Sequence, residues 1–117
     1  MNFKYKKSKT FEERNAEYKR VIKLQPKKVP IICEKAPSTR IPEIDKTKYL
    51  VDENLSMPQF IASIRKRLDL DEKEALFLLA NGKITLPQNE SIKTIYKKYK
   101  DKDGFLYIAY AAEEIWG

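Results

Sequence analysis

The chain has 117 residues, 42% of them hydrophobic and 35% charged, which suits one soluble domain with a modest core. Its single cysteine and lack of histidine exclude an internal disulfide, the usual zinc sites and catalytic pairs built on histidine. The net charge of +7 is uneven: residues 1–48 carry 14 basic and 6 acidic side chains, whereas residues 49–117 carry 10 and 11. We therefore expect a protein that is not an enzyme, has no metal or other cofactor, and attracts acidic partners.

The N-terminal part is expected to be a helical extension covering residues 1–26. Residues 1–10 are basic and form either a loose arm or a short helix. Thr10 and Glu13 have the spacing of a capping box, which predicts a helix from there to about Leu24.

The next segment is rich in β-branched residues and predicts a strand over residues 27–36. Its side chains alternate between two faces, with Val29, Ile31 and Cys33 on one and Pro30 and Ile32 on the other. Because Pro30 cannot donate a ladder hydrogen bond, we expect a sheet edge or a helix-covered face nearby. Residues 36–46 read as a loop, and residues 48–52 read as a second short strand.

A second capping box, formed by Ser56 and Gln59, predicts the main helix, which ends near Leu68. The apolar run 75–80 predicts a buried central strand. Asn81-Gly82 is a strong hairpin signal, and we expect the chain to return as a strand immediately after it.

The remaining segments complete the pattern with a short helix at 91–99, a turn at 101–104 and a last strand at 105–111. From Lys27 onward this element order is typical of a β-grasp, in which a mixed sheet wraps one main helix. We therefore predict an α+β fold, with a β-grasp core over residues 27–112 and a flexible tail over 113–117.

Several dispersed motifs resemble one family, the autophagy ubiquitin-like modifiers, and within it the GABARAP branch. They are FEER (11–14), VPIICEKA (29–36), DKTKYLV (45–51), QF (59–60), IRKRL (64–68), FLYIAY (105–110) and the final aromatic-Gly pair. The resemblance implies a ubiquitin-like fold preceded by two helices, the first within residues 3–9.

The resemblance also implies a function. Gly117 would be activated and joined by an amide bond to phosphatidylethanolamine, by an activating and a conjugating enzyme and after processing by a protease. The chain would be cytoplasmic and monomeric before conjugation, and would lie on autophagosomal or other vesicle membranes afterwards. A C-terminal glycine would fit the narrow active site of the enzymes that activate it, because glycine has no side chain. Two lipid chains anchor stably, at about 0.8 kcal/mol per buried CH₂.

The family recruits cargo receptors and adaptors through an aromatic-x-x-aliphatic motif, and the resemblance implies two pockets for it beside the edge strand 48–52. The first pocket takes the aromatic residue and comprises Glu17, Val21, Pro30, Ile32, Lys48, Leu50 and Phe105. The second pocket takes the aliphatic residue and comprises Tyr49, Val51, Leu55, Phe60, Ser63 and Ile64. Acidic neighbours of the motif would meet Lys28, Lys46 and Arg67. A plainer interpretation is that the apolar members are ordinary core residues.

Three positions depart from the family pattern. Ser63 replaces an aliphatic residue and Asp52 stands where proline is common, so the second pocket is expected to be more polar. Trp116 is bulkier than the usual aromatic residue before the glycine.

Two other functions are consistent with parts of the sequence. The chain could be a ubiquitin-like interaction domain, or a modifier attached only to proteins, without lipid. It could also bind nucleic acid, as the basic first part and the interleaved Tyr and Lys of residues 96–100 suggest. Nucleic-acid binding is disfavoured because the chain lacks a recognisable motif for it.

Overall fold

The computed structural model describes residues 1–114, and its centre is one five-stranded mixed sheet. The strands are β1 (Lys28–Lys35), β2 (Lys48–Asp52), β3 (Glu74–Ala80), β4 (Ile84–Thr85) and β5 (Leu106–Glu114). Across the sheet they follow the order β2-β1-β5-β3-β4. The central pair β1–β5 is parallel, and the other neighbours are antiparallel. This arrangement confirms the α+β, ubiquitin-like β-grasp.

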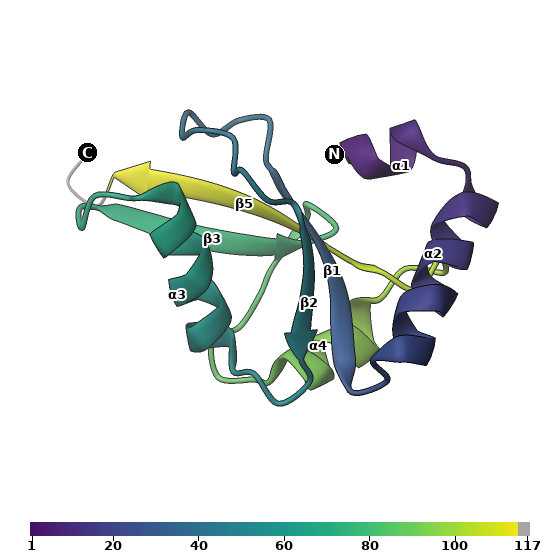
Figure 1. Ribbon diagram of the computed structural model, residues 1–117. Coiled ribbons are helices and arrows are strands. Elements are labelled where there is room, and N and C mark those ends of the chain that lie inside the picture. The colour runs from purple at the N-terminus through teal and green to yellow at the C-terminus, as the bar shows by residue number, and fades with distance from the viewer. Residues whose placement is uncertain (115–117) are drawn as a thin grey trace.

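Four helices cover the sheet: α1 (Lys4–Ser8), α2 (Phe11–Leu24), α3 (Met57–Leu68) and α4 (Ile92–Tyr99). Figure 1 shows α1 and α2 grouped at one end of the molecule, while β5 runs toward the other end. The main core joins one face of the sheet to α3 and α4, and a smaller cluster joins the other face to α1 and α2. None of these helices is long and apolar enough to cross a membrane.

Both capping boxes predicted from the sequence are present. The Thr10 hydroxyl accepts the Glu13 N–H at the start of α2, and the Ser56 hydroxyl accepts the Gln59 N–H at the start of α3. Each satisfies an N–H group that the first helical turn leaves without a partner. The structure also has both N-terminal helices that the resemblance implies, α1 and α2.

Pro30 lies within β1, a strand with neighbours on both sides. The Cys33 N–H points toward β2, where it donates to the Thr47 carbonyl. Alternation turns the Pro30 nitrogen the other way, toward β5. The ladder between β1 and β5 begins only at Ile31, opposite Leu106, so Pro30 leaves no ladder hydrogen bond unmade.

The prediction of a buried central strand at residues 75–80 is wrong in two respects. The centre of the sheet is β5, and β3 is next to the short edge strand β4. Only alternate residues of β3 are buried, and Phe77 is 39% exposed on the other face. A continuous apolar run suggests burial on both faces, but α1 and α2 cover the face at β1 and β5 rather than at β3.

The hairpin predicted at Asn81-Gly82 is confirmed. Both residues have positive φ angles, 55° and 74°, and the Lys83 N–H donates to the Ala80 carbonyl over 3.0 Å. Two consecutive left-handed residues match the twist of the flanking strands, which is why Asn-Gly favours this turn.

The C-terminal strand is longer than the sequence pattern predicts. The tail was expected to begin at Glu113, but β5 pairs with β3 as far as Glu114, which lies opposite Glu74. Pairing with a neighbouring strand keeps these residues extended although they lack apolar alternation. The remaining tail positions, 115–117, lie outside the described residues, so Trp116 and Gly117 do as well.

Candidate peptide-docking site

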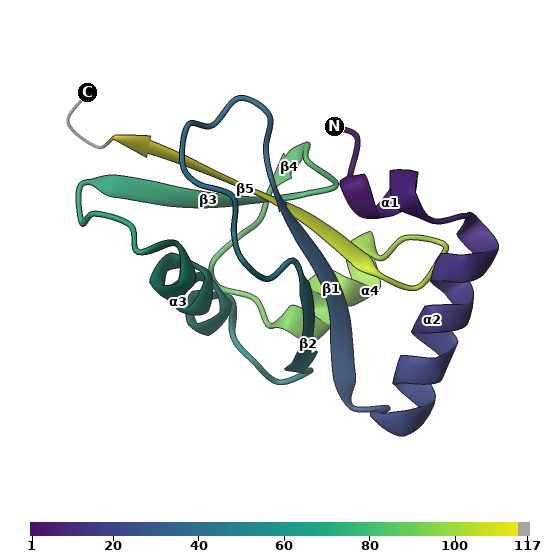
Figure 2. The ribbon, with the colours of Figure 1, turned by 45° about the horizontal axis from the view of Figure 1, so that its top comes forward.

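β2 is an edge strand, as the docking hypothesis requires. It pairs with β1 on one side only, in the register Ile32↔Lys48 and Pro30↔Leu50. Figure 2 shows β2 beside β1, after the long loop that connects them. An unpaired strand edge offers a row of backbone donors and acceptors to an added strand.

The structure brings together polar and apolar members of the first pocket. Glu17 on α2 forms an ion pair with Lys48 on β2, and Leu50 lies opposite Pro30 in the sheet register. Ile32 and Phe105 belong to the smaller buried cluster on this face. Val21 is half-buried on α2, one helical turn after Glu17. The residues predicted for the first pocket therefore gather where α2 meets the start of β2.

Two aromatic residues at this site were missed in the sequence. The ring of Tyr5 lies edge-on to Phe105 at 5.3 Å, and the ring of Tyr18 does so at 6.4 Å. The Tyr5 hydroxyl also donates to the Glu17 carboxylate, and the Lys48 Nζ lies 5.1 Å from the centre of the Tyr5 ring. Residue 5 lies in a basic segment without periodicity, so no pattern indicated that it would join this site.

The Glu17 carboxylate is held ionised by these contacts. Its partial burial acts to raise its pKa, but the hydrogen bonds from Lys48 and Tyr5 outweigh burial and lower the pKa below the usual glutamate value. Such bonds favour the charged form because they are strongest to a carboxylate. The first pocket thus contains a fixed negative charge beside a lysine.

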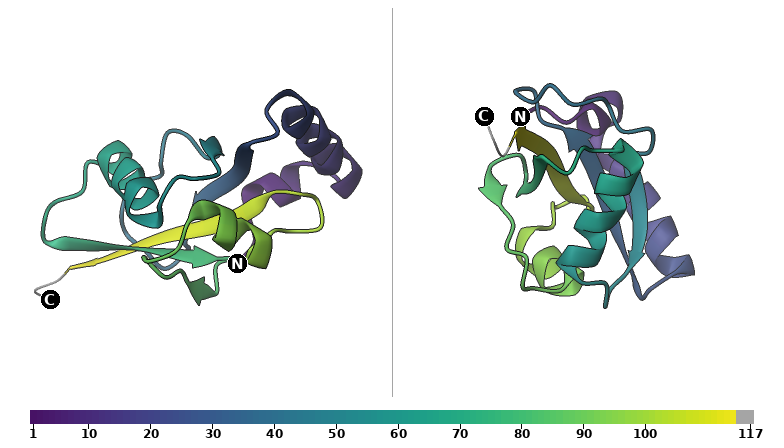
Figure 3. Two further views of the ribbon diagram at one scale, coloured as in Figure 1. Left: turned by 90° about the horizontal axis from the view of Figure 1, so that it is seen from below. Right: turned by 90° about the vertical axis from the view of Figure 1, so that its left-hand side faces the viewer.

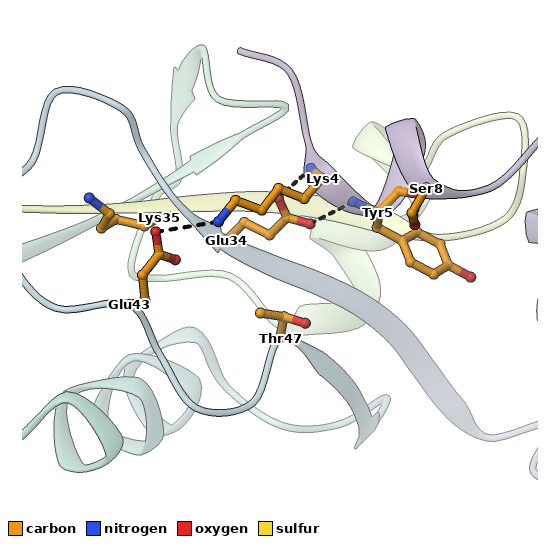
Figure 4. Close-up of a pocket in the computed structure, with 7 residues that line it drawn as sticks. All are labelled: Lys4, Tyr5, Ser8, Glu34, Lys35, Glu43 and Thr47. Atoms are coloured by element: carbon orange, nitrogen blue, oxygen red, sulfur yellow. Dashed lines mark hydrogen bonds and ion pairs between the residues drawn. The ribbon is translucent and has the colours of Figure 1, made fainter.

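A buried carboxylate anchors α1 beside the first pocket. Glu34 is 7% exposed and accepts hydrogen bonds from the backbone N–H groups of Lys4 and Tyr5, over 2.7 and 3.1 Å. The side chain of Lys4 forms an ion pair with Glu43 at 3.5 Å. Figure 4 shows these contacts around a hollow of about 300 Å³, which Thr47 also lines just before β2. Glu34 thereby fixes the position of Tyr5.

The turn before β5 anchors α2. The Arg14 Nε donates to the Asp103 carboxylate over 2.8 Å, and Asp103 is fully buried. Asp103 also accepts hydrogen bonds from the Phe105 backbone and the Tyr107 hydroxyl, so its charge is well satisfied. At Gly104, where φ is 102°, an added Cβ would lie 2.2 Å from the Tyr18 ring. Only glycine permits this approach of the turn to α2.

Three of the six residues assigned to the second pocket are buried core residues. Phe60 and Ile64 are almost completely buried, and Tyr49 packs edge-on against Phe60 at 5.9 Å. Val51 and Leu55 are half-buried at the margin of this core. The plainer interpretation is therefore correct for these three buried residues, and equally for Ile32 and Phe105 of the first pocket, which are each 1% exposed.

Ser63 is exposed on α3, and its hydroxyl donates to the Gln59 carbonyl over 3.1 Å. It lines an open hollow together with Lys66 and Arg67. Its hydroxyl is satisfied within the helix, and the residues that line this hollow with it are both basic. The structure thus places a polar rim where the second pocket would take its ligand.

The cationic residues predicted to meet acidic neighbours do not form one group. Lys46 and Arg67 both lie against the Tyr49 ring, with their charged atoms 5.1 and 5.9 Å from its centre. Arg67 is also paired with Asp45 at 3.1 Å. Lys28 instead lies opposite Asp52, at the far end of β2. Acidic groups at either end of an added strand would therefore meet different cations.

The cysteine and two of the C-terminal tyrosines have structural roles. Cys33 is fully buried, and burial raises the pKa of its thiol well above the usual range. The Tyr110 hydroxyl accepts the Ile44 N–H and donates to the Pro42 carbonyl, and the Tyr96 hydroxyl donates to the Gly104 carbonyl. The Tyr110 bonds tie the long loop to β5, and the Tyr96 bond ties the last turn to α4.

The β-grasp, its two N-terminal helices and its open edge strand define a ubiquitin-like protein with a helical extension. The model of the family described as autophagy protein Atg8, ubiquitin like, matches residues 13–117. The chain therefore belongs to the Atg8 family of autophagy-related ubiquitin-like proteins, and the family resemblance seen in its motifs is confirmed. Its branch within the family stays a prediction.

Individual relatives agree over the whole chain. It is 44% identical to autophagy-related protein 8 of Scheffersomyces stipitis, covering 100% of this chain and 84% of the relative. It is 43% identical to autophagy-related protein 8 of Saccharomyces cerevisiae, and the match covers 100% of this chain and 99% of the relative. A crystal structure of Trypanosoma brucei ATG8 matches with a TM-score of 0.90 and 42% identity over the full length of both chains.

Proposed function

We propose that this chain is a modifier that is joined through Gly117 to phosphatidylethanolamine and then recruits partners through the edge of β2. The observation that carries the proposal is the open edge strand β2, in a chain of the Atg8 family. Conjugation would place the chain on autophagosomal membranes, where autophagy partners and the conjugation enzymes act on it.

The edge of β2 supports recognition of an extended peptide. Backbone groups along the edge supply affinity that does not depend on sequence, and pockets on the two faces of the sheet supply specificity. An aromatic side chain between α2 and β2 would meet the half-buried Val21 and Leu50 and the ionised Glu17. An aliphatic side chain between β2 and α3 would meet Val51 and Leu55, which are half-buried.

The docking proposal is tested by titration calorimetry with an acidic peptide that contains Trp-x-x-Leu. We expect affinity in the micromolar range, and none when both anchors are alanine. Leu50→Ala should weaken binding by about 1–2 kcal/mol, because it removes a half-buried apolar contact from the first pocket. Tyr49 is unsuitable for this test, since its substitution would also damage the core. Equal binding of both peptides would contradict the proposal.

The conjugation proposal is tested separately with purified activating and conjugating enzymes and phosphatidylethanolamine vesicles. The wild-type chain should form a lipid adduct, and Gly117→Ala should form none while its thermal unfolding stays unchanged. The alternative, a modifier attached only to proteins, predicts a protein adduct and no lipid adduct. Normal lipidation of Gly117→Ala would contradict attachment at this residue.

A further inference from the structure

A cationic hollow lies at the opposite edge of the sheet from the docking site. We call it the lysine hollow; it has a volume of about 460 Å³ and is lined by Lys6, Lys83, Lys100, Lys102, Asp101 and Ile84, among others. Three segments far apart in sequence form it: the N-terminal arm, the β3–β4 hairpin and the chain after α4. Figure 3 (left panel) shows the N-terminus beside this hairpin.

The lysine hollow has an excess of positive charge that the chain does not neutralise. Lys6 is paired with Asp101 at 2.6 Å. The other three lysines are exposed and form no ion pair within residues 1–113. Gathering like charges is unfavourable unless a counter-charge is bound. The hollow therefore suits an anionic ligand.

Its backbone framework is fixed by hydrogen bonds. The Asn81 N–H donates to the Tyr107 carbonyl and the Asp101 N–H donates to the Phe105 carbonyl, each over 2.8 Å. The first bond ties the hairpin to the central strand β5, and the second closes the turn that leads into that strand. At Gly82, an added Cβ would lie only 2.8 Å from the Met1 side chain. The lysines thus project from positions that are set before any ligand arrives, which lowers the cost of binding.

The lining also contains apolar surface. Ile84 is 47% exposed and Tyr99 is half-buried at the same hollow. A phosphate polyanion would leave this surface uncovered, and an extended nucleic acid needs a charged track rather than a compact hollow. An acidic protein segment with an aliphatic side chain would match both the charge and the apolar contact.

We propose that the lysine hollow is a second docking surface, which binds an acidic segment of a partner protein that carries an aliphatic residue. The strand order places β4 at one edge of the sheet and β2 at the other. Both surfaces are therefore accessible at once, and a partner in the lysine hollow leaves the edge of β2 open.

The test uses a ten-residue peptide of glutamate and aspartate with one central leucine and no aromatic residue. We expect amide chemical-shift changes at Lys83, Ile84 and residues 99–102 at physiological salt. The variant K83E/K100E/K102E should weaken binding by about tenfold or more, because it reverses three charges around the ligand. Leu50→Ala should leave this binding unchanged, which separates it from the docking site on β2.

The matched control is K73E/K97E/K98E, which changes the net charge equally at exposed lysines outside the hollow. Equal weakening by both triple variants, or shifts confined to β2, would overturn the proposal. Single-stranded RNA and phosphatidylserine vesicles provide the competing probes. Binding of either probe that is lost in K83E/K100E/K102E, without binding of the peptide, would assign the hollow to phosphate groups and also overturn it.

Discussion

The two pockets beside β2 are constructed differently. The first pocket lies between the sheet and two N-terminal helices, and its polar contacts join Tyr5, Glu17 and Lys48 from three separate elements. The second pocket lies directly on the main core, so that Phe60 and Ile64 serve the fold and the site together. The exposed and half-buried members of the first pocket, such as Lys48 and Leu50, can therefore be changed without loss of the fold, whereas the buried Ile32 and Phe105, like Phe60 and Ile64 of the second pocket, cannot.

The largest expected effect is on stability, and it compares a buried residue of the second pocket with a half-exposed residue of the first. Phe60→Ala should lower the free energy of unfolding by about 3–5 kcal/mol, because it empties a fully buried position. Leu50→Ala, at the first pocket, should cost about 1 kcal/mol because its side chain is already half-exposed. Urea unfolding of both variants measures the two values. Similar losses would mean that the first pocket is equally part of the core.

An intermediate effect is expected from restoring an apolar rim to the second pocket. Ser63→Leu should raise the affinity for a Trp-x-x-Leu peptide about fourfold for each methylene that the ligand covers, at about 0.8 kcal/mol per CH₂. Calorimetric titration of the peptide into Ser63→Leu and into the wild-type chain measures this change in affinity. Ala62→Leu, at an exposed neighbouring position of α3, is the matched control and should leave affinity unchanged. An unaltered affinity of Ser63→Leu would place the aliphatic side chain elsewhere.

The smallest effect concerns the ion pair of the first pocket. Because the pKa of Glu17 is lowered in the folded chain, its charge stabilises the fold above the usual glutamate range, and this contribution is lost as pH falls through the folded-state pKa. Glu17→Gln should therefore cost about 0.2–1 kcal/mol near neutral pH, and the cost should disappear in acid.

Urea unfolding between neutral and acidic pH checks this expectation. Glu72→Gln removes an exposed carboxylate outside any ion pair of the described residues and serves as the control. A difference between wild type and Glu17→Gln that grows as pH falls would have the wrong sign for this mechanism.

Local chemistry in the sequence determined the elements of the fold. The capping boxes at Thr10 and Ser56 began two helices where predicted, and Asn81-Gly82 made the hairpin, since these signals act through neighbouring backbone groups. Alternation in residues 29–33 correctly separated the two faces of β1. The order of the predicted elements indicated the β-grasp, and the family resemblance indicated the edge strand β2.

The tertiary structure alone decided burial and the partners of each side chain. The run at 75–80 is apolar throughout, but its exposed face follows from where α1 and α2 pack. Tyr5, which lies beside the residues of the first pocket, is held by a hydrogen bond from its backbone to Glu34, 29 residues further along the chain. Arg14 and Asp103, which are 89 positions apart, also form a hydrogen bond. The lysine hollow likewise joins three distant segments. A periodic pattern reports only which face of its own element is apolar, so contacts between elements require the folded chain.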